Sequence, residues 1–341
     1  MPVGIVYDAI YLEHDTGDHP ENAQRLEAVA SYLRTSGVWD RLLQVQAKPA
    51  SVDDLRRVHT THLIDTVQRI AKAGGGAVDY DTVIGPRSYE VARLAAGGVI
   101  AAADATLAGR VSSAYALVRP PGHHATAARA MGFCLFNNVA VAARWALEVA
   151  GVERLAIVDI DVHHGNGTAE AFASDPSVLY VSLHQYPLFP GTGHWREIGS
   201  GAGEGTVLNV PLPPHTGDVG YRQAFERLVV PAVRRFAPEL LLVSIGYDAH
   251  WADPLSWMLL SLSGYRAMMD DLTALARALC QGRIVVALEG GYDTTVLAHG
   301  VRGTLASLMD EDGDDPLGPA REPETDVNPL IDAIAKLHRL E

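Results

Sequence analysis

A run of potential metal ligands follows an apolar segment near the middle of the chain. Residues 155–158 are apolar, and residues 159–167 read DIDVHHGNG. Strand side chains alternate between the two faces of a sheet, so Asp159, Asp161 and His163 share one face. Two carboxylates and an imidazole held together repel one another and lose hydration unless a cation or strong donors meet them. The pattern favours a metal site at a strand end over a solvated strand end with ordinary hydrogen bonds.

The same arrangement, an apolar run followed by polar or glycine residues, occurs at four other places. The apolar runs cover residues 114–118, 179–183, 240–245 and 284–288, and they lead into RPPGHH (119–124), His184, GYD (246–248) and EGGY (289–292). Such runs are typical of strands that are buried on both faces, as in a parallel sheet covered by helices. Ligands bind beyond the carboxyl ends of strands in these sheets, so we expect all the polar clusters at one edge.

The segments between these strands have the apolar patterns of the helices that parallel crossovers require. They cover residues 90–107, 139–150, 221–236 and 263–279. The alternation runs without a linker from about residue 90 to 310, so we predict one α/β domain over residues 1–341. Residues 1–90 are predicted to be an N-terminal elaboration packed on that domain. Residues 310–341 are predicted to form an acidic turn and a C-terminal tail whose last helix begins near Pro329.

Composition narrows the classes of function. The formal net charge is −14 and lysines and arginines form no cluster, which argues against nucleic acid as a partner. The first residues lack the features of a signal peptide, and no window approaches the ~20 apolar residues of a membrane span. We therefore expect a cytoplasmic protein without a membrane partner, of unspecified oligomeric state. Cys134 and Cys280 are too few and too distant for disulfides or a thiolate zinc site, so we expect buried thiols.

Three of the polar residues have the chemistry of a catalytic metal site. Asp161, His163 and Asp248 would give a cation N and O ligands and leave positions open for water and a substrate oxygen, as in catalytic zinc sites. Fe2+ or Co2+ also suits such ligands. His123 and His124 follow a rigid Pro-Pro-Gly turn that could direct both rings into one pocket, where a neutral imidazole takes up a proton.

Further residues could support that chemistry. Asp159 and Asn166 are candidate partners that fix the tautomers of the two rings. Tyr292 could present its phenol O–H to a developing oxyanion. Each feature also has a structural alternative, such as a turn-stabilising histidine pair, a tight Gly290-Gly291 turn or a helix N-cap at Asp248. Their joint occurrence at strand ends favours a catalytic site.

With these motifs the chain resembles a known superfamily, that of the histone deacetylases and acetylpolyamine amidohydrolases. The motifs that carry the resemblance extend over nearly the whole chain: HPE (19–21) with Arg25, RPPGHHA (119–125), GFC (132–134), residues 159–167, FPGTG (189–193), Asp248 and EGGY (289–292). Asn166 and Glu289-Gly290-Gly291 look like the class II branch and its bacterial relatives. The resemblance implies an arginase-like three-layer α/β sandwich, with a mostly parallel sheet of about eight strands covered by helices on both faces.

The resemblance also implies a mechanism. It assigns one zinc ion per chain to Asp161, His163 and Asp248, where it would activate a water and the amide carbonyl. It implies that His124 is the general base and later the acid for the leaving amine. His123, paired with Asp159, would give electrostatic support.

The remaining roles come from the same resemblance. Tyr292 would complete the oxyanion site. Phe133 and Phe189, with Gly132 beside them, match the walls of a narrow tunnel for an acyl-lysine chain. Arg25 matches a residue behind the zinc that handles the acetate product.

The family also carries a structural potassium ion. The resemblance implies that backbone oxygens of Asp159, Asp161 and His163, the side chain of Ser182 and the carbonyl of Leu183 bind it. This ion would reduce the negative charge beside the zinc.

Several substrates and functions stay open. We expect a deacylase of acylated amines that prefers acyl-lysine in proteins or peptides, and the alternative is an acetylpolyamine amidohydrolase. Polyamine-selective relatives carry a glutamate after the Asp-Pro pair at the tunnel mouth, and a longer insertion near residues 74–87. In this chain the residue after the Asp-Pro pair is Leu255, which offers no partner to an ammonium group of the substrate.

Two other classes of function compete. An arginase-type ureohydrolase needs further carboxylates for a second metal, yet Gly165 and His250 occupy the expected places. A non-enzymatic acyl-group or metal-dependent binding module predicts damage to the catalytic residues. His123, His124 and Tyr292 are all intact.

Overall fold

A central sheet of eight strands organises the chain, whose computed structural model describes residues 1–340. The strands are β1 (Val3–Val6), β2 (Leu43–Gln44), β5 (Ser113–Ala116), β6 (Leu155–Asp159), β7 (Val178–Gln185), β8 (Val207–Leu212), β9 (Leu240–Ile245) and β10 (Ile284–Leu288). Their order is β2-β1-β5-β10-β9-β6-β7-β8, and every neighbouring pair is parallel. A small antiparallel hairpin, β3 (Gly76–Ala77) and β4 (Val83–Ile84), lies outside this sheet.

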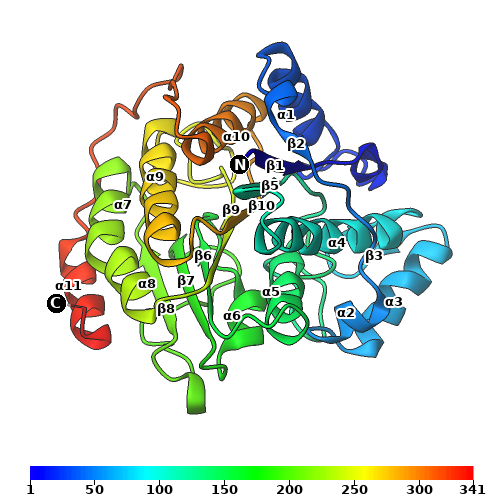
Figure 1. Ribbon diagram of the computed structural model, residues 1–341, viewed down its shortest axis with the longest axis horizontal. Helices are drawn as coiled ribbons and strands as arrows, with labels where there is room; N and C mark the ends of the chain where they lie inside the picture. Colours follow the sequence, from blue (N-terminus) through cyan, green and yellow to red (C-terminus); the bar gives the residue numbers. More distant parts are fainter. Residues whose placement is uncertain (341) are drawn as a thin grey trace.

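Helices cover both faces of the sheet and complete a three-layer sandwich (Figure 1). One face carries α4 (Ser88–Leu107), α5 (Asn138–Glu148) and α6 (Asn166–Phe172). The other carries α1 (Gln24–Thr35), α7 (Asp218–Ala224), α8 (Val230–Phe236), α9 (Leu262–Leu279), α10 (Thr294–Met309) and α11 (Asn328–His338). Two further helices, α2 (Val52–Arg56) and α3 (Thr61–Lys72), pack outside α4 and α5.

Burial explains why the central strands are largely apolar. All residues of β9, LLLVSI, are buried, and so are all residues of β6 and β10. A strand with helices on both faces has no solvated side, so polar alternation would leave polar groups without water. The five strands predicted from apolar runs are therefore confirmed as β5, β6, β7, β9 and β10.

Three strands of the central sheet were not predicted. Residues 1–90 were expected to pack on the domain as an elaboration, but they supply β1 and β2 of its sheet, with Gly4 paired to Ala114 and to Leu43. The strand β2 has two residues, too few to give a clear apolar run. The third, β8, contains Asn209 and Pro211. Proline cannot donate to a ladder, and it is tolerated because β8 is an edge strand.

The predicted helices are largely confirmed. Residues 90–107, 139–150 and 263–279 correspond to α4, α5 and α9. Residues 221–236 form α7 and α8 with a π-helical turn, Phe225–Val229, between them. The last helix begins at Asn328 with a proline in its first turn. None of the helices in residues 1–340 combines the length and the apolarity that a membrane crossing requires.

The parallel topology determines where functional side chains gather. Neighbouring parallel strands end at the same edge, so the loops after β5, β6, β9 and β10 meet there. These four loops carry the polar clusters found in the sequence.

Candidate active site

Three buried ligands meet where β6 and β9 end. Ligand atoms of Asp161, His163 and Asp248 lie within 4.8 Å of one another, and no second group of this kind occurs among residues 1–340. Asp161 and His163 follow β6, and Asp248 follows β9, its neighbour in the sheet. The spacing predicted from the sequence thus brings the three side chains together.

The geometry of this group fits a divalent cation such as zinc. His163 Nδ1 lies 3.1 Å from Asp161 Oδ1 and 3.3 Å from Asp248 Oδ2. Ligands bonded at 2.0–2.1 Å to a tetrahedral zinc are about 3.3 Å from one another. Asp248 Oδ2 is buried without a hydrogen-bond partner, which is costly for a carboxylate unless a cation meets it.

Gly290 is packed against these ligands. A Cβ atom there would lie 2.2 Å from Asp248 Oδ2 and 2.6 Å from Asp161 Oδ2. The Gly290 N–H donates to Asp161 Oδ2 at 2.9 Å. The next residue, Gly291, has φ +109°, which favours glycine. The two glycines therefore form a tight turn and also let the backbone approach the metal group closely.

His123 and His124 stand beside the metal group with different partners. His123 Nδ1 is 3.0 Å from Asp159 Oδ2, and His124 Nδ1 is 2.9 Å from Asn166 Oδ1. The two rings are 4.0 Å apart between centroids. Both expected partners are therefore in place. Each imidazole uses Nδ1 for its partner and keeps Nε2 for the pocket.

The partners and the burial push the two pKa values apart. Burial would lower the pKa of His123, but the carboxylates of Asp159 and Asp161 raise it to about 10. Burial, together with the neighbouring His123 and His163, holds the pKa of His124 well below 6.5. One imidazolium beside one neutral imidazole is an arrangement suited to acid and base chemistry.

These groups line a cavity of about 220 Å³. Its walls are formed by Tyr80, Asp81, Pro121, His123, His124, Gly132, Phe133, His163, Leu188, Phe189, Leu255, Gly290 and Tyr292. The Phe189 ring packs 5.0 Å from His124 and 6.4 Å from His163, and the Phe133 ring packs 5.9 Å from Tyr292. A Cβ at Gly132 would lie 2.5 Å from His124 Cδ2, so only glycine lets the backbone pass this close to the His124 ring.

Arg25 lies behind Tyr292 and is not among the lining residues. Its guanidinium carbon is 5.1 Å from the centre of the Tyr292 ring, and it donates to the carbonyls of Glu289 and Gly291 at 2.6 and 2.7 Å. Burial raises the pKa of the Tyr292 phenol well above 10, so the O–H stays a donor. Arg25 thus supports the turn that carries the phenol.

Ser182 and Leu183 lie in β7, beside the segment that carries the metal ligands. Ser182 is paired in register with Asp159 of β6. Its Oγ lies 2.9 Å from His184 Nδ1. The register places Ser182 beside Asp159, two of the residues expected at a potassium site.

The positions considered for a second metal offer no further carboxylate. A Cβ at Gly165 would lie 2.2 Å from Asp159 Oδ2. No carboxylate side chain fits there. His250 is buried and lies outside the metal group.

Sequence reasoning missed Tyr80, Asp81 and Leu188 of the pocket lining, and Asp253 beside it. Tyr80 and Asp81, between β3 and β4, form part of the entrance. Asp253 is buried and accepts hydrogen bonds from the backbone N–H of Tyr292 and of Leu255. An isolated acidic residue in a loop has no periodic pattern, so only its contacts reveal it. Cys134 and Cys280 are buried free thiols, as expected.

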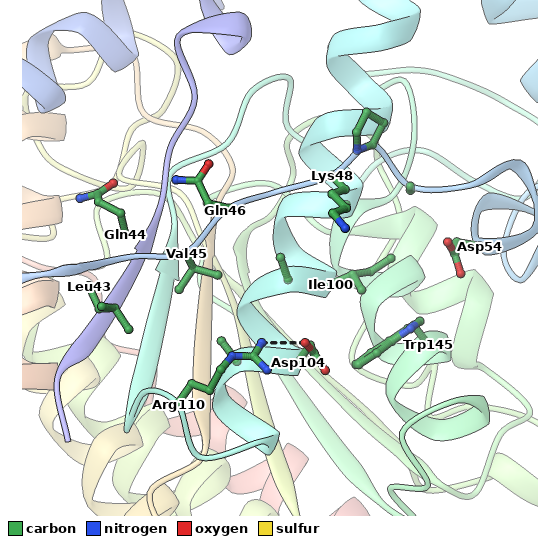
Figure 2. A pocket seen from close by; sticks show the side chains of 15 residues that line it. Leu43, Gln44, Val45, Gln46, Lys48, Asp54, Ile100, Asp104, Arg110 and Trp145 are labelled. Atoms are coloured by element: carbon green, nitrogen blue, oxygen red, sulfur yellow. Dashed lines mark hydrogen bonds and ion pairs between the residues drawn. The ribbon is translucent and has the colours of Figure 1, made fainter.

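A larger hollow of about 640 Å³ lies beside β2, α4 and α5 (Figure 2). It is bounded by the segment around Val45, by Ile100 of α4 and by Trp145 of α5. Its Asp104 and Arg110 form an ion pair of 2.7 Å. This hollow holds none of the metal-binding residues and is not the candidate active site.

Comparisons with known proteins agree with this geometry. The histone deacetylase domain matches residues 19–308. A probable deacetylase of Archaeoglobus fulgidus is 40% identical over 351 residues, which cover 100% of this chain and 96% of that protein. A histone deacetylase-like amidohydrolase of Pseudomonas aeruginosa is 46% identical over 275 residues, which cover 80% of this chain and 72% of that protein.

A solved structure agrees as well. The crystal structure of the HDA15 HD domain matches with a TM-score of 0.90 and 36% identity, and the match covers 99% of this chain and 94% of that one. The chain therefore belongs to the histone deacetylase family and is a hydrolase that acts on amide bonds.

Proposed function

We propose that the protein removes acetyl or other short acyl groups from acylated amines, and that acyl-lysine in peptides or proteins is its preferred substrate. The observation that carries this proposal is the convergence of the metal group, two histidines and a phenol on one pocket. Nucleophile activation, proton transfer and oxyanion stabilisation are the three needs of amide hydrolysis, and each has a candidate group there.

Asp161, His163 and Asp248 would hold the metal, which we propose to be zinc. Bound zinc supplies a Lewis acid that activates a water and the substrate carbonyl. Asp161 and Asp248 are fully buried, so their charge faces the cation with little screening.

His124 is the proposed general base. Its Nδ1–H donates to the neutral amide of Asn166, which leaves Nε2 with a lone pair toward the pocket. The same nitrogen returns the proton to the leaving amine. His123 faces the Asp159 carboxylate, which favours the imidazolium form, and this charge stabilises negative charge that develops in the pocket.

Tyr292 is the proposed oxyanion donor. It lines the pocket, and its neutral phenol has an O–H to donate. A single donor of this kind contributes about 10²–10³ in kcat.

The walls of the pocket support a lysine-like substrate. Phe133, Phe189 and Leu255 are apolar and would contact the neutral methylene stem of acyl-lysine. One observation favours the acetylpolyamine alternative, because Asp81 places a carboxylate at the same entrance. That carboxylate could pair with a substrate ammonium.

A structural potassium ion is a further proposal. Ser182 and Leu183 of β7 would share it with backbone oxygens of Asp159, Asp161 and His163. The support is the strand register that pairs Ser182 with Asp159.

Competition between the two substrates tests the assignment. We expect kcat/KM to be higher for an acetyl-lysine peptide than for acetylspermidine. Leu255→Glu should shift the ratio toward the polyamine by about 1–3 kcal/mol, the scale of one well-placed charged partner. Asp81→Asn is the matched variant, and it should weaken only turnover of the polyamine. A wild-type enzyme that prefers acetylspermidine would make the polyamine alternative the correct one.

A further inference from the structure

Asp253 is a buried acid whose contacts all lie on segments that line the pocket. It is 5% exposed. Its Oδ2 accepts hydrogen bonds from the backbone N–H of Tyr292 at 2.7 Å and of Asp293 at 3.3 Å. Its Oδ1 accepts from the N–H of Leu255 at 2.9 Å. One carboxylate thus joins the loop after β9 to the turn that carries the phenol.

The turn with Tyr292 has no regular structure of its own. Residues 289–293 lie between β10 and α10, outside any strand or helix. Arg25 holds the carbonyls of Glu289 and Gly291, and Asp161 accepts from the N–H of Gly290. These contacts fix the first half of the turn and leave its second half to other groups.

Asp253 supplies the contacts of that second half. Its carboxylate accepts hydrogen bonds from the backbone N–H groups of Tyr292 and Asp293. The Tyr292 ring is in contact with Phe133 and with the Arg25 guanidinium, which pack on its apolar surface. Ring packing alone lets a ring slide along its plane, whereas two hydrogen bonds at the backbone fix the Cα from which the phenol extends. An error of about 1 Å in such a donor costs about 10²-fold in rate.

We propose that Asp253 is a positioning residue that holds the Tyr292 phenol where the oxyanion develops. This inference rests on the proposed function, because it assumes that Tyr292 is the oxyanion donor. Asp253 lies outside the metal group, so its effect does not depend on ligation of the metal.

Asp253→Asn is a sharp test because it keeps the size of the side chain. An amide has one acceptor oxygen, so it serves either Tyr292 and Asp293 or Leu255, and its NH2 group faces an N–H on the other side. We expect kcat to fall about tenfold or more, with KM and metal content unchanged.

A double-mutant cycle separates positioning from a general structural role. In a Tyr292→Phe background the phenol is already absent, so Asp253→Asn should cost less than about twofold more. Asp293→Asn is the matched control. The Asp293 side chain caps α10 through the N–H groups of Thr295 and Val296, and asparagine caps equally well, so kcat should stay within about twofold.

Hydrogen exchange gives a readout without turnover, and it applies to the wild type even if the variant does not fold. The amides of Tyr292 and Asp293 should exchange slowly, and faster in Asp253→Asn. Exchange at Tyr292 as rapid as at Tyr80, which is 96% exposed, would overturn the inference. So would equal losses from Asp253→Asn in both backgrounds. An unimpaired Tyr292→Phe enzyme would instead refute the proposed role of Tyr292 itself.

Discussion

Gly290→Ala should strongly weaken metal binding although it adds a single methyl group. The new Cβ would lie 2.2 Å from Asp248 Oδ2 and 2.6 Å from Asp161 Oδ2, whereas real Cβ contacts essentially never fall below 3.0 Å. The Asp248 oxygen must therefore move by at least about 0.8 Å, and the Asp161 oxygen by about 0.4 Å. Ligand distances in a metal site tolerate only about ±0.2 Å, so both carboxylates would leave their coordinating positions.

The assay compares metal content and turnover of purified proteins. We expect Gly290→Ala to lose about 10²-fold or more in metal affinity, and deacetylation of an acetyl-lysine peptide to fall with it. The control is Gly303→Ala in α10, where a Cβ would have no neighbour within 4 Å. Alanine favours a helix over glycine by about 0.5–1 kcal/mol, so this control should keep its metal, its activity and its stability.

The outcome that refutes the reasoning is a Gly290→Ala protein with full metal content and unchanged kcat. It would mean that the two carboxylates do not bind the metal in the positions seen here. Loss of activity in both glycine variants would point to general sensitivity of the fold.

Three further predictions concern the oxyanion donor, proton transfer and buried charge. Tyr292→Phe should lower kcat by about 10²–10³ with metal content unchanged, and His124→Ala should lower kcat at least as much. Steady-state kinetics on the metal-loaded proteins measures both losses. An unchanged kcat in either variant would exclude the role proposed for the residue that was replaced. Burial raises the pKa of Glu21, but the nearby Arg119, His14 and Arg25 outweigh it and lower that pKa to about 2. The ionised Glu21 carboxylate therefore stabilises the fold above about pH 4.5, and this stabilisation is lost as the pH falls toward 2. Glu21→Gln should lower the free energy of unfolding in urea by about 3–5 kcal/mol at pH 7 and by progressively less in acid. A difference between the two proteins that does not depend on pH would contradict this.

The sequence was informative where chemistry and strand pattern coincide. Asp161, His163 and Asp248 each follow an apolar run, and parallel strands carry such residues to a common edge, so their meeting could be predicted. Asp159 and Asn166 could be named as partners of the two rings; the pairing of His123 with Asp159 came from the family resemblance, and the structure adds the pairing of His124 with Asn166.

Other features had no signal of this kind. Asp253 and Asp81 are acids in loops, and such residues are usually solvated, so their position at or beside the pocket depends on tertiary packing alone. The strand β8 was hidden by Pro211, which is permitted because only one side of that strand is paired. The strand β2 has two residues and leaves no pattern in the sequence.

The most direct test of a one-metal amide hydrolase is stepwise reconstitution. The protein is stripped with a chelator, zinc is added in known amounts, and turnover of an acetyl-lysine peptide is measured at each step. The three-ligand group predicts no activity without metal and a linear rise that saturates at one equivalent per chain. Full turnover in the stripped protein, or a rise that continues to two equivalents, would contradict this account.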